Sequence, residues 1–211
     1  MYHGQTGRLE VVCGSMFSGK TEELFRRLRR AELARKRVLT IKNQIDTRSG
    51  TTIVTSHNGN YREAVPLENS PQMIELITRM AEDADVIGID EIQFFSPDII
   101  PSLRTLVAHN KRIIVAGLDL DFRGEPFPIV ANLLALADDV LKLAAICMNC
   151  GETAHYTQRI INGQPASYYD PVILVGASEF YEARCRACFT LVDNPHPYIH
   201  IPAHKPQQSS Y

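Results

Sequence analysis

The residues Gly14-Ser15-Met16-Phe17-Ser18-Gly19-Lys20-Thr21 fit the pattern G-x-x-x-x-G-K-S/T, and the prediction of the fold starts from them. Residues 9–13 before them are short and apolar enough for a buried strand, and the helix formers of residues 21–37 predict a helix after them. Glycines at both ends let successive backbone N–H groups point inward, and the following helix adds its positive N-terminal end. A chance match in a turn rich in glycine and serine is the alternative, but the two flanks favour a nucleoside triphosphate site.

A second apolar run, residues 86–89, ends in the acidic pair Asp90 and Glu91. It predicts a buried strand whose carboxyl end brings carboxylates to the phosphate site. In such a site Lys20 reaches the outer phosphates, while the Thr21 hydroxyl and Asp90 bind magnesium. The acidic pair could instead cap the next helix, but its combination with the phosphate loop favours a functional role.

Strands and helices alternate along the chain after the phosphate loop. Further buried strands are expected at residues 38–42 and 112–118, with helices at residues 97–109 and 130–137. This alternation predicts an α/β domain of the P-loop NTPase type over residues 1–142, with a parallel sheet covered by helices on both faces.

Residues 43–61 form a polar, turn-rich connection that is long for a compact domain. Arg48 could neutralise phosphate charge there, with Asp46 near the magnesium ion, and a solvated loop is the alternative. A short strand at residues 62–67 and a helix that begins at Ser70-Pro71 are expected to follow.

The bulk properties are those of an ordinary globular protein. The 211 residues are 45% hydrophobic and carry a net charge of -2, with a pI near 6.4. This balance argues against a broad nucleic-acid-binding surface, so the arginines of residues 26–37 are interpreted as a solvated, partly paired helix face. The sequence shows neither a signal peptide nor a stretch of membrane-spanning length. We therefore expect a cytoplasmic location, where the five cysteines stay reduced.

Two C-x-x-C pairs stand late in the chain, Cys147 with Cys150 and Cys185 with Cys188. Each pair offers two thiolates at a spacing that suits one tetrahedral zinc ion, whereas redox pairs would need a thioredoxin-like setting. Four sulfur ligands leave no open position for water. The zinc ion is therefore expected to be structural.

Residues 143–195 are expected to form a small, ribbon-like zinc-binding domain, and residues 196–211 a disordered tail. The interval between the cysteine pairs is longer than in a compact zinc ribbon, so a long segment of the chain must extend away from the metal and return to it. Its apolar residues 171–176 and Tyr181 are available to enclose a small flat ligand. The remaining cysteine, Cys13, is expected to be an inert buried thiol.

The phosphate loop is followed, in this order, by Asp90-Glu91-Ile92-Gln93-Phe94-Phe95, Leu118-Asp119-Leu120-Asp121-Phe122 and the two cysteine pairs. Together these motifs resemble the type II thymidine kinase family from about residue 8 to residue 196. The resemblance implies transfer of the γ-phosphate of ATP, with Mg²⁺, to the 5′-hydroxyl of thymidine. It also implies a homotetramer and feedback inhibition by thymidine triphosphate (dTTP). From the charge balance and the lack of a membrane-spanning stretch, we expect no nucleic-acid or membrane partner. A pocket for thymine would tolerate deoxyuridine as a poorer substrate.

The same resemblance implies roles for individual residues. Glu91 matches the family's general base, and Gln93 of the same motif is expected to assist ATP binding with Arg48 and the phosphate loop. Asp46, near the magnesium ion, and Arg48 match the family's D-T-R segment. Some relatives carry histidine at the last zinc position, where this chain has Cys188. The residues that match those around the nucleoside are Met16, Phe94, Leu118, Phe122, Thr157, Val172, Leu174, Gly176 and Tyr181.

Two other functions stay open at this point. Another phosphate-loop kinase, acting on a nucleoside monophosphate or a different small alcohol, would often carry an arginine-rich lid, and no late stretch concentrates arginines in that way. An ATP-driven nucleic-acid-binding protein with a zinc ribbon would need a basic surface with aromatic residues near the cysteines. That region instead holds Glu152, Asp170, Glu179 and Glu182.

Overall fold

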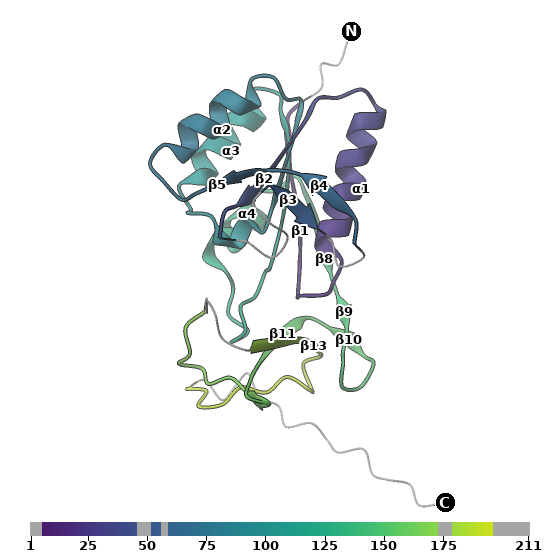
Figure 1. Cartoon of the computed structure of the whole chain (residues 1–211), viewed down its shortest axis with the longest axis vertical. Coiled ribbons are helices and arrows are strands. Elements are labelled where there is room, and N and C mark those ends of the chain that lie inside the picture. Colours follow the sequence, from purple (N-terminus) through teal and green to yellow (C-terminus); the bar gives the residue numbers. More distant parts are fainter. Residues whose placement is uncertain (1–5, 46–51, 56–58, 173–178, 196–211) are drawn as a thin grey trace, which may run out of the picture.

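The computed structural model describes residues 6–45, 52–55, 59–172 and 179–195 (Figure 1). Four predicted site residues lie outside these ranges, namely Asp46, Arg48, Leu174 and Gly176, as does the predicted tail at residues 196–211. Among the helices that are described, none is long and apolar enough to span a bilayer.

A parallel sheet forms the centre of the first part of the chain. Its strands in the described residues are β1 (Arg8–Gly14), β2 (Val38–Asn43), β5 (Val65–Leu67), β6 (Val86–Asp90), β7 (Arg112–Gly117) and β8 (Asp139–Leu143). They lie in the order β5-β2-β6-β7-β1-β8, and every neighbouring pair runs parallel. Parallel strands end at one edge of a sheet, so the carboxyl ends of β1, β6 and β7 meet there.

Helices cover both faces of this sheet, which confirms the predicted α/β fold (Figure 1). One face carries α1 (Lys20–Leu33), and the other carries α2 (Met73–Ala81), α3 (Ile99–Ala108) and α4 (Pro128–Leu136). Because strand side chains alternate, Val12 of β1 packs with Leu24 of α1, whereas Val11 and Cys13 join the larger core under the other helices. Burial raises the pKa of Cys13 to about 11, as expected for an inert thiol.

The helix boundaries differ most from the prediction at the end of α1 and the start of α2, whereas α3 and α4 differ by one or two residues at each end. The α1 helix ends before residue 37 because Arg35 adopts a left-handed conformation (φ 58°) and the Lys36 N–H bonds back to the Ala31 carbonyl. This is a Schellman-type end, formed without the glycine that usually marks it. The α2 helix begins at Met73 rather than at residue 70, because residues 70–72 form a turn in which the Ser70 carbonyl accepts the Met73 N–H.

The polar connection at residues 43–61 contains a strand that its sequence pattern did not predict. Here β3 (Ile53–Thr55) pairs antiparallel with β4 (Tyr61–Glu63), so the strand expected at residues 62–67 is divided between β4 and β5. Lys42, at the end of β2, is fully buried, and its Nζ donates to the Ile53 carbonyl oxygen at 3.0 Å. This contact ties the hairpin to the edge of the sheet where the strands end.

The later part of the chain forms small antiparallel sheets beyond the carboxyl ends of the parallel strands (Figure 1). In it β9 (Ala145–Ile146) pairs with β10 (Thr153–Ala154), and β11 (Tyr156–Ile161) pairs with β12 (Gln164–Pro165) and β13 (Glu179–Arg184). Asn162 and Gly163, both at positive φ, make the tight turn between β11 and β12. This placement brings the second part of the chain over the phosphate loop.

Candidate active site

The phosphate loop joins β1 directly to α1. Gly14 has a φ of 147°, and a Cβ at this position would lie 2.3 Å from the Leu143 carbonyl oxygen of β8, so only glycine fits. Gly19 precedes α1 in a left-handed conformation, with a φ of 85°. The two glycines turn the loop over the N-terminus of α1, where a helix favours an anion.

Two side chains of the loop bond to its own backbone. Lys20 Nζ donates to the Ser15 carbonyl oxygen at 2.7 Å, and Ser18 Oγ donates to the same oxygen at 2.8 Å. Lys20 is buried, so its ammonium group stays beside the loop. The arrangement combines a positive charge with the helix N-terminus, which suits the charge of a polyphosphate.

The two predicted magnesium ligands that the structure describes lie in contact. Thr21 Oγ1, in the first turn of α1, donates to Asp90 Oδ2 at 3.1 Å. Burial raises the pKa of Asp90 to about 7, and the neighbouring Glu91 carboxylate adds to this shift. A hydroxyl and a carboxylate are oxygen ligands that Mg²⁺ prefers, and a nearby cation would favour the ionised carboxylate. The donor set therefore fits magnesium.

Glu91 follows β6 in a left-handed backbone conformation (φ 51°), a strained geometry that clusters at functional sites when the residue is not glycine. Its Oε2 accepts a hydrogen bond from Gln93 Nε2, and Gln93 Oε1 accepts the Leu118 N–H at 3.0 Å. Gln93 is buried in the 3₁₀ helix η1 (Ile92–Phe94). Gln93 therefore connects the predicted general base to the loop after β7.

The residues predicted to surround thymidine come from both parts of the chain. Thr157 Oγ1 of β11 accepts the Met16 N–H at 3.0 Å, and Ser15 Oγ donates to the Ala154 carbonyl oxygen at 3.4 Å. These bonds bring β11 and β10 into direct contact with the phosphate loop. The half-buried members of the predicted set are Met16, Phe94, Leu118, Val172 and Tyr181, and the buried ones are Phe122 and Thr157.

Three of these residues meet around Arg159, to which the sequence pattern assigned no role. Arg159 of β11 stacks on the Phe122 ring at 4.1 Å from the ring centroid. It also donates to the Tyr181 hydroxyl and to the Val172 carbonyl oxygen. The feature of the sequence that could have pointed to Arg159 is its charge, because the rest of the run Tyr156–Ile161 is uncharged.

The four cysteines predicted to bind zinc come together, although the two pairs are far apart in the sequence. The Sγ atoms of Cys147, Cys150, Cys185 and Cys188 all lie within 4.8 Å of one another. A tetrahedral ion with Zn–S bonds of about 2.3 Å needs sulfur atoms about 3.8 Å apart, so the cluster fits zinc. Burial opposes ionisation of Cys147, yet backbone N–H groups, among them that of Cys185, lower its pKa to about 6. Thiolate character of this kind suits a metal ligand.

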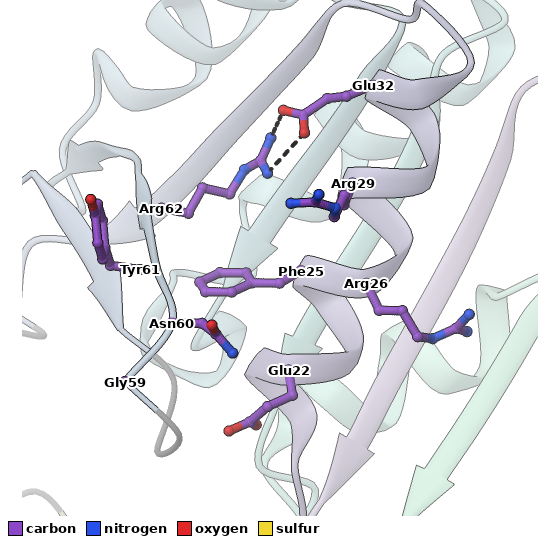
Figure 2. A pocket seen from close by; sticks show the side chains of 9 residues that line it. All are labelled: Glu22, Phe25, Arg26, Arg29, Glu32, Gly59, Asn60, Tyr61 and Arg62. Carbon is purple, nitrogen blue, oxygen red and sulfur yellow. Dashed lines mark hydrogen bonds and ion pairs between the residues drawn. The ribbon is translucent and has the colours of Figure 1, made fainter.

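The arginine-rich face of α1 is partly paired with carboxylates, as its charge pattern indicated. Arg27 bonds to Glu10 at 2.6 Å and to Glu23 at 2.8 Å. A groove of about 450 Å³ lies beside this helix, between α1 and β4. Figure 2 shows the Phe25 ring pointing from α1 into it. None of the predicted site residues in the described ranges lines the groove. It is therefore separate from the candidate active site.

Comparisons with known proteins agree with this arrangement. The family model described as thymidine kinase matches residues 7–189. A thymidine kinase of Coprothermobacter proteolyticus is 57% identical over 181 residues, which cover 86% of this chain and 89% of that protein.

Two solved structures show a low overall similarity to this chain. The flagellar accessory protein FlaH of Methanocaldococcus jannaschii is 15% identical, with 71% of this chain and 76% of that chain covered and a TM-score of 0.46. A DNA replication initiation factor is 16% identical, with 65% of this chain and 40% of that chain covered and a TM-score of 0.40. At these values neither likeness favours one function over another. Because the family model spans both the phosphate loop and the cysteine cluster, and the relative matches over most of both chains, this chain belongs to the thymidine kinase family.

Proposed function

We propose that this chain transfers the γ-phosphate of ATP to the 5′-hydroxyl of thymidine and so produces thymidine monophosphate. The observation that carries the proposal is the family match over residues 7–189, which includes every catalytic and zinc-binding residue expected from the sequence. The named activity of the Coprothermobacter relative supports the same substrate.

The phosphate loop and Lys20 hold the β- and γ-phosphates in this proposal, while Thr21 and Asp90 hold the magnesium ion. The 3.1 Å contact between the Thr21 hydroxyl and the Asp90 carboxylate supports this pairing, because both oxygens can then face one ion. When bound, Mg²⁺ neutralises charge on the phosphate oxygens. Arg48 and Asp46 are proposed to assist from the segment outside the described residues.

Glu91 is proposed to act as the general base. It accepts a hydrogen bond from the 5′-hydroxyl and takes the proton as the new oxygen–phosphorus bond forms and the γ-phosphate leaves ADP. The bond from Gln93 Nε2 supports this role, because it holds the Glu91 carboxylate in one orientation at the end of β6. Gln93 is therefore proposed to position the Glu91 carboxylate beside the ATP site.

The nucleoside is proposed to lie between the two units, residues 1–142 and residues 143–195. The hydrogen bond from Met16 to Thr157 supports this placement, since it joins the phosphate loop to β11 at the edge where the parallel strands end. A pocket shaped for the thymine methyl group gains only about 1–3 kcal/mol from it, so deoxyuridine should react more slowly rather than not at all.

Three further properties belong to the proposal: a homotetramer, inhibition by dTTP and a cytosolic location. The four reduced cysteines of the zinc site support a reducing compartment. Light scattering of the purified protein tests the tetramer, and a dTTP titration at fixed thymidine tests the inhibition. A monomer by scattering, or full activity at a large excess of dTTP, would contradict the respective property.

The test of the main proposal is a phosphorylation assay with thymidine, deoxyuridine and deoxyadenosine, together with DNA as an alternative stimulus of ATP hydrolysis. We expect thymidine to be the best substrate and DNA to have no effect. In Glu91→Gln, kcat should fall by roughly a hundredfold or more while nucleoside binding survives, because the amide keeps the shape but not the basicity. The control is the same substitution at an exposed position, Glu82→Gln, which should leave kcat unchanged. Stimulation by DNA but not by any nucleoside would overturn the proposal.

A further inference from the structure

Arg159 is only 1% exposed, and its guanidinium group lies where three other stretches of the chain meet. Nη1 donates to the Pro171 carbonyl oxygen at 2.6 Å, and Nη2 donates to that of Val172. Nε and Nη2 donate to the Tyr181 hydroxyl oxygen at 3.1 and 2.9 Å. One face of the group stacks on the Phe122 ring, 4.1 Å from the centroid. All three nitrogen atoms and one face are therefore in use.

We propose that Arg159 is a positioning residue that sets the arrangement of Phe122, Val172 and Tyr181 and, through them, the affinity for the nucleoside. The inference rests on the proposed function, because these three residues are expected to surround thymidine. They come from different places: Phe122 follows β7, Tyr181 lies in β13, and Val172 lies between β12 and β13. A single rigid plane that touches all three fixes their mutual distances.

The contacts need a guanidinium group. Its N–H donors are held in one plane, so it can serve carbonyl oxygens on one side and a hydroxyl on another while its face remains available for a ring. Lysine has one nitrogen and no flat face, so it cannot keep the same partners together. Removing the donors would also take away hydrogen bonds that the Pro171 and Val172 carbonyl oxygens now accept.

The test compares Arg159→Lys and Arg159→Met with Arg184→Lys and Arg184→Met. Arg184 lies on the neighbouring strand β13 and bonds to Glu182, so its variants alter the same sheet without touching the three nucleoside residues. Thymidine and ATP are varied in turn, and zinc content and the unfolding temperature are measured on each preparation. We expect the KM for thymidine to rise on the order of tenfold to a hundredfold in both Arg159 variants, with the KM for ATP nearly unchanged.

A double-mutant cycle with Tyr181→Phe separates positioning from general stability. If Arg159 acts through the Tyr181 hydroxyl, Arg159→Lys must cost less in the Tyr181→Phe background than in the wild-type chain. Additive costs would overturn the inference. So would an equal rise of both KM values, or a thymidine KM no higher than in the Arg184 variants.

Two further outcomes remain informative. If the wild-type chain does not phosphorylate thymidine, the proposed function fails, and the same comparison is made with the nucleoside that gives the highest turnover. If the KM for that nucleoside is unchanged in the Arg159 variants, the inference fails independently of the proposed function. If both Arg159 variants lose zinc and unfold, Tyr181→Phe alone tests the inference, because it removes only the hydroxyl oxygen that accepts from Arg159. An unaltered thymidine KM in that variant would refute the positioning role.

Discussion

Gly117→Ala offers a steric test of the connection between Gln93 and Glu91. A Cβ on Gly117, at the end of β7, would lie 2.6 Å from Gln93 Oε1 and 2.7 Å from Ile92 Cγ2. Ordinary contact begins at 3.4 Å, so the Gln93 amide must retreat by about 0.8 Å, the difference between these two distances. Since the same amide bonds to Glu91 and to the Leu118 N–H, the proposed base moves with it.

A shift of this size at the proposed base should reduce kcat on the order of tenfold to a hundredfold, because misplacement by about 1 Å costs about a hundredfold. The added methyl group should also destabilise the fold by about 1–3 kcal/mol. Gly88→Ala in β6 is the matched control. Its Cβ meets Leu28 Cδ1 of α1 at the same 2.6 Å, and its three nearest atoms all belong to Leu28 in the core.

The assay is kcat at saturating thymidine and ATP, with the free energy of unfolding measured on the same preparations. Both variants should lose stability, but only Gly117→Ala should lose turnover. Turnover of Gly117→Ala close to that of the wild-type chain would show that the position of Gln93 does not control Glu91. An equal loss of turnover in Gly88→Ala would lead to the same conclusion, because the effect would then follow stability rather than Gln93.

Three further predictions concern the metals and the pH dependence of stability. Removing zinc with a chelator, or by Cys185→Ser, should unfold the second part and abolish turnover, because structural zinc contributes on the order of 10 kcal/mol; retained turnover at negligible measured zinc would contradict this. Thr21→Ala should raise the Mg²⁺ concentration for half-maximal turnover on the order of tenfold, whereas Thr21→Ser should not. The same half-maximal Mg²⁺ concentration in both variants would show that the Thr21 hydroxyl does not bind the ion. Burial acts to raise the pKa of Glu10, but hydrogen bonds from Arg112 and Arg27 outweigh it and lower the pKa. Its stabilisation should be complete above the unfolded pKa of about 4.3 and decline as the pH falls further. Denaturant unfolding of Glu10→Gln should therefore show its largest deficit near neutral pH, and a deficit constant down to pH 3 would exclude this linkage.

Features whose chemistry is local could be predicted from the residue pattern. The phosphate loop, the acidic end of β6 and the two cysteine pairs each follow from residue types at short spacing, and the alternation of apolar runs predicted the parallel sheet with helices on both faces. Sequence reasoning was less accurate where a usual marker was missing. The left-handed Arg35 ends α1 without a glycine, and β3 lies in a connection whose polar residues predict a loop.

The contacts between residues far apart in the chain follow from the three-dimensional arrangement and could not be predicted from local patterns. The bond from Met16 to Thr157 spans 141 positions, the contact of Gly117 with Gln93 depends on the neighbouring positions of β6 and β7, and Arg159 acquires its partners from three separate stretches. The physical reason is that local patterns set which residues are buried and in what conformation. Strand order, register and the return of the chain to the zinc site set which of those buried groups face one another.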